Sequence, residues 1–277
     1  MKIHYYHIDS FTKSVFSGNP AGVCILEDWL PDSMMLNIAR ENGLAETAFI
    51  IGNQSSYQIR WFTPDIEMDL CGHATLAAAH VVANFLEKTN RIAFYSKNDR
   101  IDIDISDGRI AMKLPRRPAS ATIAPQILLD SVSIKPIAVL KARDYLFIYG
   151  NENDVRNIQI NTEIFNQINL DPGGLCVSSL GQSVDFVSRY FTPQSTILED
   201  PVTGSAHCSL VPYWAEKLGK NVLKARQVSP RGGELYCQDL GSSVEVAGYA
   251  VTYKVGEIEV SFCGTPLPES GLNSLAG

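Results

Sequence analysis

The chain carries two copies of one stretch of sequence, and this duplication constrains its fold more than any other feature. Residues 46–64 align with residues 175–193 without a gap, at an offset of 129 (193 minus 64). Arg-Trp-Phe-Thr-Pro at 60–64 thereby matches Arg-Tyr-Phe-Thr-Pro at 189–193. Each copy is followed by a short loop and a small-residue turn into an apolar segment. The duplication predicts two similar lobes rather than one lobe with a long tail.

Composition and charge limit the class of protein. At 277 residues, of which 45% are apolar, the chain is long enough to bury two hydrophobic cores. The net charge is −7 and the basic residues are scattered, which argues against a nucleic-acid partner. No apolar run reaches the length of a bilayer-spanning helix, and residues 1–7 contain no secretory signal core. We therefore expect a cytoplasmic protein with no membrane partner.

The cysteine pattern gives no sign of a metal or of a disulfide framework. The six cysteines are widely spaced, and no Cys-x-x-Cys pair occurs among them. We expect no structural zinc site and no other metal centre.

Both halves of the chain predict the same order of elements: a helical segment, two β-rich runs, an apolar helix and a closing pair of strands. The first half has a helix at 31–43, strands at 46–51 and 57–63, a helix at 73–87, and strands at 100–105 and 109–114. The second half has a helical segment from 161, strands at 175–180 and 184–192, a helix at 204–218, and strands at 234–238 and 243–248. Both apolar helices carry few charges, which is typical of helices buried on all sides.

A three-proline stretch at 115–125 predicts a linker between the lobes. We therefore divide the chain into a first lobe at residues 1–118 and a second lobe at residues 124–277. The expected fold class is α+β, with two pseudo-symmetric lobes that each wrap a curved sheet around one central helix. The last strand, at about 250–262, fits either lobe, and the sequence leaves its placement open.

Glu46 is the main candidate for chemistry. It aligns with Leu175 in the second copy, so the shared fold does not demand a carboxylate there. A glutamate that enters an apolar β-rich run is costly to bury, and burial favours the neutral form of a carboxyl group, which suits proton transfer. The alternative is a strand-edge glutamate in water or an acid that caps a helix.

Two glycine turns occupy equivalent places in the copies. Gly72 and His73 are expected to open the first apolar helix, and Gly204 and Ser205 the second. Free N–H groups at a helix N-terminus favour an anion, and glycine lets a ligand approach the main chain. We predict that a substrate carboxylate binds at one of the turns and that both glycines belong to the substrate site; the alternative is that small residues here only permit tight packing. A helix N-terminus also tends to keep an imidazole neutral, so His73 suits hydrogen bonding or proton relay.

Asp200 lies in a loop that is three residues longer than its counterpart. Pro193 to Gly204 spans eleven positions (204 minus 193), and Pro64 to Gly72 spans eight (72 minus 64). Because a proline follows Asp200 and restricts its backbone, this residue is a better functional candidate than the glutamate before it. The alternative is that the Asp-Pro pair only shapes a turn.

Five motifs run in order through residues 4–262 and together resemble a known family. They are Gly18-Asn-Pro-Ala, Glu46-Thr-Ala-Phe, Arg60-Trp-Phe-Thr-Pro, Asp69-Leu-Cys-Gly-His-Ala-Thr-Leu-Ala and Glu199-Asp-Pro-Val-Thr-Gly-Ser-Ala-His. The chain resembles PhzF-like proteins, a family named for a phenazine-biosynthesis isomerase. The resemblance implies a diaminopimelate epimerase-like fold, in which each lobe is a β-barrel-like mixed sheet around a central helix and the active site lies between the lobes. It also implies a homodimer.

The same resemblance implies catalytic roles for four side chains. It assigns to Glu46 the general acid/base that moves a proton on a small substrate without a cofactor. It completes the catalytic site with His73, Asp200 and Ser205.

Three further residues are candidates for substrate binding. Epimerases with this fold use a pair of cysteines, but the counterpart of Cys71 is Thr203, so we expect Cys71 to line the cleft rather than act as a base. The family places Asn19 near the cleft. Arg231 is followed by two glycines and suits a carboxylate ligand. For Asn19 and Arg231 the alternative is a turn without a ligand.

We therefore predict a cofactor-independent isomerase of a small carboxylate-bearing metabolite, with Glu46 moving a proton between carbons. The first alternative is an epimerase or racemase, which needs a second base such as His73 or Asp200. The second alternative is a non-catalytic homologue that binds a metabolite or a protein.

Overall fold

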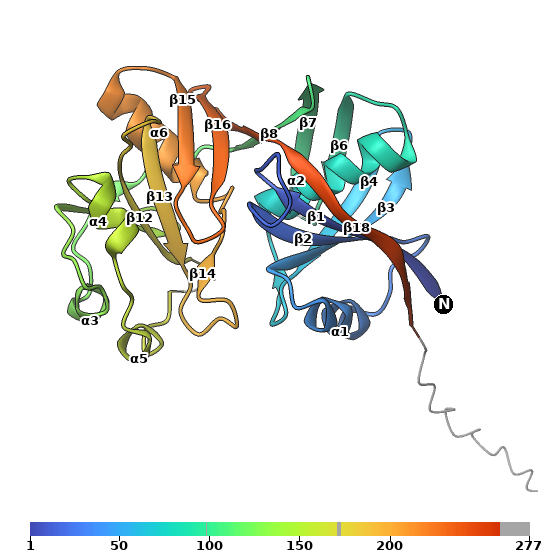
Figure 1. Cartoon of the computed structure of the whole chain (residues 1–277), viewed down its shortest axis with the longest axis horizontal. Coiled ribbons are helices and arrows are strands. Elements are labelled where there is room, and N and C mark those ends of the chain that lie inside the picture. Colours follow the sequence, from blue (N-terminus) through green and yellow to red (C-terminus); the bar gives the residue numbers. More distant parts are fainter. Residues whose placement is uncertain (98, 171–172, 261–277) are drawn as a thin grey trace, which may run out of the picture.

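An apolar helix lies within a curved sheet in each of two lobes (Figure 1). The computed structural model describes residues 1–97, 99–170 and 173–260. The chain first forms β1 (Lys2–Ser10), β2 (Asn19–Ile25), α1 (Asp32–Asn42), β3 (Glu46–Asn53), β4 (Ser56–Phe62), β5 (Glu67–Met68), α2 (Gly72–Val81), the π-helical turn η1 (Val82–Leu86), β6 (Arg91–Tyr95), β7 (Arg100–Ser106) and β8 (Arg109–Pro115). It continues with β9 (Ser120–Ala121), α3 (Gln126–Asp130), β10 (Ala138–Lys141), β11 (Tyr145–Ile148), α4 (Glu152–Asn157), α5 (Thr162–Phe165), β12 (Leu175–Leu180), β13 (Phe186–Phe191), β14 (Glu199–Asp200), α6 (His207–Leu218), β15 (Val222–Gln227), β16 (Gly233–Asp239), β17 (Ser243–Gly248) and β18 (Ala250–Glu259).

The central helices are apolar around most of their circumference, which is why a sheet can surround them. Every residue of α2 except His80 is buried, and the helix contacts β1, β2, β3 and β8. In the second lobe α6 contacts β15, β16 and β17. The predicted α+β class, with a mixed sheet around one helix in each lobe, is confirmed. None of the described helices is long and apolar enough to cross a bilayer.

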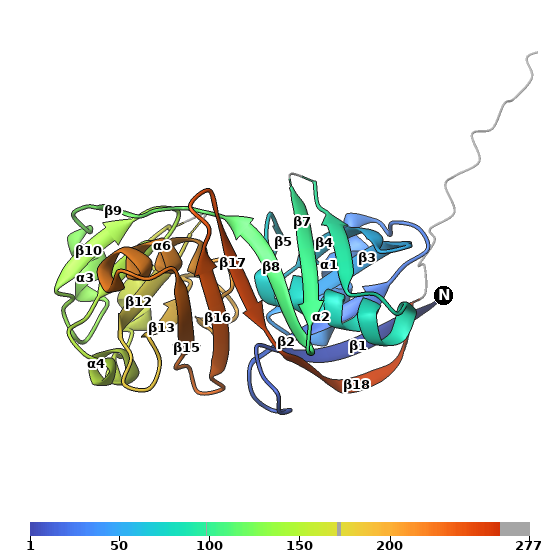
Figure 2. The same cartoon turned by 90° about the horizontal axis from the view of Figure 1, so that it is seen from above.

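Antiparallel pairing of β8 with β17 joins the lobes into one sheet, with Met112 opposite Val246 (Figure 2). Beyond this seam the chain from β8 reaches β9, which pairs with β10 in the second lobe. The chain from β17 reaches β18, which pairs with β1 in the first lobe. The last strand therefore crosses back to the first lobe, and residues 261–262 of its expected range lie outside the described residues. The proline-rich linker at 115–125 contains strand β9.

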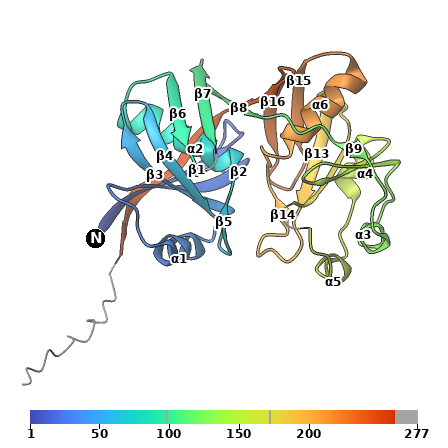
Figure 3. The ribbon, with the colours of Figure 1, turned by 180° about the vertical axis from the view of Figure 1, so that it is seen from behind.

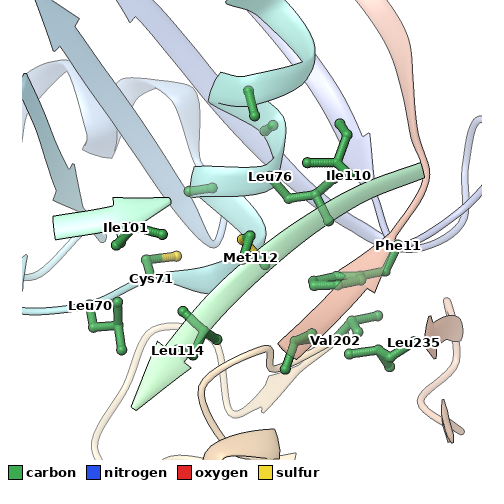
Figure 4. Close-up of a cluster of buried hydrophobic side chains, with 14 of the residues drawn as sticks. Phe11, Leu70, Cys71, Leu76, Ile101, Ile110, Met112, Leu114, Val202 and Leu235 are labelled. Carbon is green, nitrogen blue, oxygen red and sulfur yellow. The ribbon is translucent and has the colours of Figure 1, made fainter. Parts of the chain in front are cut away.

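One hydrophobic core continues across the seam (Figure 4). Met112 of the first lobe and Val202 and Leu235 of the second belong to the same buried cluster. Phe11 leaves β1 and packs against the second lobe, where a Cβ on Gly248 would lie only 2.5 Å from its ring. Close packing of this kind, together with the seam, sets the relative placement of the lobes.

The structural counterpart of Glu46 is a glycine, so the equivalence with Leu175 read from the gapless alignment is wrong. In the first lobe the phenylalanine of the Phe-Thr-Pro motif lies opposite Thr47, whereas in the second lobe it lies opposite Leu175. Leu175 therefore corresponds to Thr47, and Gly174 corresponds to Glu46.

The hairpin loops explain this shift of one residue. A tight turn at 54–55 joins β3 to β4, whereas residues 181–185 join β12 to β13. Because alternate residues of a strand face opposite sides, one residue decides which side chains face the central helix. Glu46 shares its face with Ala48, which belongs to the central core, but Leu175 belongs to a separate cluster on the other face.

The arginines of the repeated motif hold equivalent acidic residues. Arg60 Nε lies 2.7 Å from Glu67 Oε1, and Arg189 Nε lies 2.7 Å from Glu199 Oε1. The three extra residues of the second loop therefore precede the glutamate. Asp200 does have a counterpart, which is the methionine that ends β5.

The two glycine turns contact each other directly. A Cβ on Gly72 would lie 3.1 Å from Cα of Gly204, and a Cβ on Gly204 would lie 3.2 Å from Cα of Gly72. Both turns were expected to open their helices directly. This is so for α2, which begins at Gly72, but α6 begins only at His207. In the second lobe a tighter turn precedes the helix, in which the His207 N–H donates to the carbonyl of Gly204 at 3.1 Å.

Gly72→Ala is expected to lower the free energy of unfolding by about 1–3 kcal/mol, because the added methyl group meets backbone atoms that cannot rotate away. Urea unfolding measures this change. Gly150→Ala is the matched control, since a Cβ at Gly150 has no heavy atom within 4 Å. Equal stability of the two variants would contradict the importance of the glycine contact.

Candidate active site

The lobes enclose a cavity of about 610 Å³. The short strands β5 and β14 lie on the facing sides of the two lobes (Figure 3). Most of the residues that the sequence singled out line this cavity: Glu46, Cys71, Gly72, His73, Asp200, Gly204 and Ser205. The cavity thus collects polar groups from both copies of the repeat.

Glu46 and His73 form a buried ion pair on the first-lobe wall of the cavity. Oε2 of Glu46 lies 3.1 Å from Nε2 of His73, and the two side chains are 14% and 3% exposed. The Ser10 hydroxyl donates to the carbonyl of His73 at 2.8 Å and holds the start of α2. The Nε2 atom has no well-aligned hydrogen bond to any of the described residues. The nearest acceptor for an N–H at this atom is the Glu46 carboxylate.

The surroundings of His73 favour its charged form. Burial by itself lowers the pKa of an imidazole, but the Cys71 thiol and the Glu46 carboxylate raise the pKa of His73 well above its usual value. The expectation of a neutral imidazole is wrong, because a carboxylate at 3.1 Å outweighs the partial charge of a helix terminus.

Cys71 lies on the other side of the imidazole, with Sγ 3.5 Å from Nδ1 of His73. Burial, followed by the charge of Glu46, raises the pKa of Cys71 to about 11. Ligand atoms of these three residues lie within 4.8 Å of one another, as in a metal site. The thiol and the carboxylate, however, contact opposite ring nitrogens and do not converge on one coordination point. The arrangement fits a hydrogen-bonded relay better than a metal centre.

Asp200 faces the same cavity from the second lobe. Its carboxylate accepts hydrogen bonds from Nδ2 of Asn19 at 2.6 Å and from Oγ1 of Thr203 at 2.5 Å. Burial raises the pKa of Asp200 to about 6, while the charge of His73 lowers it and that of Glu46 raises it. A carboxyl group with this pKa can take up and release a proton near neutral pH.

Asn19 orients Asp200 instead of lining the cavity, which corrects its prediction as a direct substrate ligand. Asn19 is fully buried, and its Nδ2 also donates to the carbonyl of Val202 at 2.9 Å. Since Asn19 begins β2, these hydrogen bonds cross from the first lobe to the second.

Gln227 also holds Asp200 in place, although no motif in the sequence had indicated it. Nε2 of Gln227 donates to the carbonyl of Asp200 at 2.6 Å, and its Oε1 accepts from the N–H of Thr203 at 2.9 Å. Gln227 ends β15 and belongs to no motif. Thr203 was visible in the sequence as the counterpart of Cys71 and as a member of the fifth motif, but without a role.

Arg231 lies outside the cavity, so its prediction as a substrate ligand is wrong. Its guanidinium donates to Oδ1 of Asp9 at 2.8 Å and to the carbonyls of Ser17 and Gly18 at 3.2 and 2.9 Å. These bonds tie the loop after β1 to the second lobe. The glycines after Arg231 had suggested a ligand site, but the guanidinium is already bound.

Tyr190 fills the place in the second lobe that corresponds to the side chain of Glu46. A Cβ on Gly174 would lie 2.6 Å from the Tyr190 hydroxyl, so no side chain fits there. The hydroxyl donates to Oδ1 of Asp144 at 2.8 Å, and Tyr190 lines the cavity. The two walls of the cavity therefore differ in chemistry as well as in sequence.

Comparisons with known proteins confirm the resemblance seen in the motifs. Residues 8–256 match the family described as phenazine biosynthesis-like protein. An uncharacterized isomerase of Pseudomonas aeruginosa is 41% identical over 263 residues, which cover 94% of this chain and 100% of the relative. The crystal structure of a phenazine biosynthesis protein of the PhzF family from Enterococcus faecalis has a TM-score of 0.88 at 39% identity and covers 94% of this chain and 100% of that chain. A hydroxyproline epimerase from Agrobacterium vitis shares the fold, with a TM-score of 0.60 at 8% identity over 93% of this chain and 92% of the epimerase.

Asp200→Asn is expected to change how stability depends on pH. The native pKa of Asp200, about 6, exceeds the ordinary value of 3.8, so the native protein binds this proton more tightly than the unfolded chain does. The free energy of unfolding of the unmodified protein should therefore fall relative to that of Asp200→Asn as the pH rises from about 4 to about 6, by up to roughly 3 kcal/mol.

Urea unfolding of both proteins between pH 4 and 7.5 measures this difference. The variant also loses the hydrogen bonds from Asn19 and Thr203. This loss changes its free energy of unfolding by an amount that does not vary with pH. A difference that stays constant over the whole range would contradict the raised pKa of Asp200.

Proposed function

Because the chain belongs to the phenazine biosynthesis-like family, we propose that it is a cofactor-independent isomerase in which Glu46 moves a proton between two carbons of a small carboxylate-bearing metabolite. The metabolite binds in the cavity between the lobes. The isomerase names of two relatives, which are 41% and 39% identical to this chain, support this class of reaction.

The observation that carries this proposal is the buried contact between Glu46 and His73 at 3.1 Å. The imidazolium lies beside the carboxylate, and the carboxylate can accept a proton from a carbon acid. The positive charge of the imidazolium also stabilises the negative charge that develops as the C–H bond breaks.

The N-terminus of α2 suits the carboxylate of the substrate. Gly72 and His73 line the cavity, and Cys71, which precedes the helix, provides no side-chain cap for its first N–H groups. These N–H groups and the helix dipole favour an anion. Ser205 lines the cavity from the other lobe and can add a hydroxyl donor.

The proposed step conserves atoms and electrons. The Glu46 carboxylate removes a proton from a carbon next to a π system, and the electron pair of the broken C–H bond moves into that π system. The carboxyl group of Glu46 then returns the proton to the far carbon. The result is a shifted double bond, and the step needs no oxidant or reductant.

Asp200 supports epimerisation as a second candidate function. It faces the cavity from the lobe opposite Glu46, and its pKa is raised to about 6. An epimerase needs one group to remove a proton from a carbon and another to deliver one to its opposite face. The Cys71 thiol, with a pKa of about 11, is a weaker candidate for the second group.

Glu46→Gln tests the proposal, because glutamine keeps the size of the side chain but cannot accept a proton from carbon. Exchange of substrate C–H for deuterium in D₂O, followed by NMR over a panel of small carboxylates, is expected to fall by about 10²–10⁴-fold. A shifted double bond in the product indicates the isomerase, and inversion at a single carbon indicates the epimerase.

The matched control is Glu41→Gln, which removes the same charge from an exposed position on α1 and should keep the rate of the unmodified protein. Exchange that survives Glu46→Gln unchanged would rule out the role of Glu46. No exchange by the unmodified protein over a broad panel would favour a non-catalytic binding protein.

A further inference from the structure

A second cavity, of about 420 Å³, adjoins the cavity between the lobes. The two cavities share Asp69, Arg143 and Leu170 in their walls. We call the second cavity the annex, and its other lining residues are Arg117, Lys141, Ala142, Tyr145 and Gly174. The annex is therefore a direct neighbour of the cavity that contains the N-terminus of α2.

The pairing of the strands shows which hairpin of the first lobe is equivalent to the hairpin beside the annex. Gly22 of β2 lies opposite Thr47, and Tyr145 of β11 lies opposite Leu175. Because Leu175 corresponds to Thr47, Tyr145 corresponds to Gly22. The hairpin β10–β11 therefore corresponds to the hairpin β1–β2.

The hairpin of the second lobe is shorter, and the annex lies at its turn. Strands β1 and β2 pair as far as Ser10 and Asn19 and are joined by residues 11–18. Strands β10 and β11 stop at the pair of Lys141 with Tyr145, and their turn contains only residues 142–144. The second lobe thus lacks the chain segment that extends and closes the first hairpin, and a space remains beside the active site.

Positive charge dominates the walls of the annex. Three lining residues are basic and one, Asp69, is acidic. Asp69 Oδ1 lies 3.1 Å from Nη2 of Arg143, and Lys141 Nζ lies 4.5 Å from the centre of the Tyr145 ring. Arg117 is half-buried, and its guanidinium forms no ion pair with any acidic residue at 1–97, 99–170 or 173–260. Because Arg117 is partly desolvated and has no ion pair of its own among these residues, an anion placed here gains binding energy.

The nearby buried Asp144 is a second acidic group whose charge acts on Arg117 and Arg143. Its Oδ1 accepts hydrogen bonds from the Tyr190 hydroxyl at 2.8 Å and from the Gly174 N–H at 3.0 Å. Burial raises the pKa of Asp144, while these hydrogen bonds and the charges of Arg143 and Arg117 lower it. With Asp69 and Asp144 set against Arg117, Lys141 and Arg143, the described residues around the annex keep one excess positive charge.

We propose that the annex binds the second anionic group of a dianionic substrate, whose first carboxylate lies at the N-terminus of α2. The group is an oxyanion, either a carboxylate or a phosphate, because the planar donors of Arg117 and Arg143 match both. This assignment rests on the proposed function for the first carboxylate, but the charge and shape of the annex are independent of it.

Binding of inorganic phosphate to the annex tests the charge recognition without any catalysis. Titration of phosphate into ¹⁵N-labelled protein should shift the amide resonances of residues 117 and 141–145. The dissociation constant should rise by about tenfold or more in Arg117→Gln, because a charge-assisted hydrogen bond is lost. Arg117→Lys should restore part of the affinity, since it keeps the charge but not the planar donors.

Arg100→Gln is the matched control, because it removes one positive charge from a fully exposed ion pair with Asp102, and it should bind phosphate like the unmodified protein. Thermal unfolding of each variant shows that the fold is retained. Phosphate affinity in Arg117→Gln equal to that in Arg100→Gln overturns the proposal.

Substrate selectivity tests the link to the active site. The D₂O exchange assay compares monocarboxylates with analogues that carry a second carboxylate or a phosphate, and this comparison also separates the two oxyanions. For the preferred dianionic analogue, Arg117→Gln should raise KM by about tenfold or more with little change in kcat. An unmodified protein that prefers monocarboxylates overturns the dianionic assignment.

Different results would contradict the proposed function and the assignment of the annex as an oxyanion site. If exchange occurs and Glu46→Gln abolishes it, but Arg117→Gln leaves phosphate binding unchanged, the annex assignment is wrong and the proposed function stands. If Arg117→Gln weakens phosphate binding but the unmodified protein catalyses no exchange, the oxyanion site is supported and the proposed function is wrong.

Discussion

The backbone contact between Gly72 and Gly204 is the constraint on which the rest of the structure depends. A Cβ on either glycine would lie 3.1–3.2 Å from the Cα of the other, so no other residue fits without movement of the backbone. The contact places the start of α2 against the turn before α6. It brings the residues that follow the glycines, His73 and Ser205, into one cavity. It also lets one hydrophobic core continue across the seam of β8 and β17.

Around this contact the two lobes carry different chemistry at equivalent positions. Glu46 corresponds to Gly174, whose missing side chain leaves room for a tyrosine hydroxyl. Asp200 corresponds to Met68, at the end of a strand that an arginine–glutamate pair holds in both lobes. Glu46 and Asp200 therefore reach the cavity from opposite lobes and from non-equivalent positions. This asymmetry is consistent with the proposed role of Glu46 as the one main acid/base, with Asp200 in different surroundings.

The charged groups of the cavity act as one coupled system. His73 is stabilised as a cation by Glu46, and its charge in turn lowers the pKa of Asp200 while that of Glu46 raises it. A change of protonation at one of the three therefore alters the other two. Asn19 and Thr203 hold the Asp200 carboxylate in place through hydrogen bonds of 2.6 and 2.5 Å. Beside this system lies the annex, whose walls hold Arg117, Lys141 and Arg143.

The sequence by itself determined the duplication, the fold class, the main elements and the residues around the glycine turns, because apolar periodicity and turn residues act over short distances. The hairpin at Asp107–Gly108 is an example, since both residues adopt the positive φ that such a turn requires, at 52° and 74°. Only the tertiary structure decided that Glu46 corresponds to a glycine in the second lobe, since a one-residue change of register, set by the length of a distant loop, moves every side chain to the other face. Only the tertiary structure decided that Asn19 serves Asp200, because that hydrogen bond joins residues 181 positions apart. Local patterns carry no information about contacts at such separations, and the folded chain alone brings those residues together.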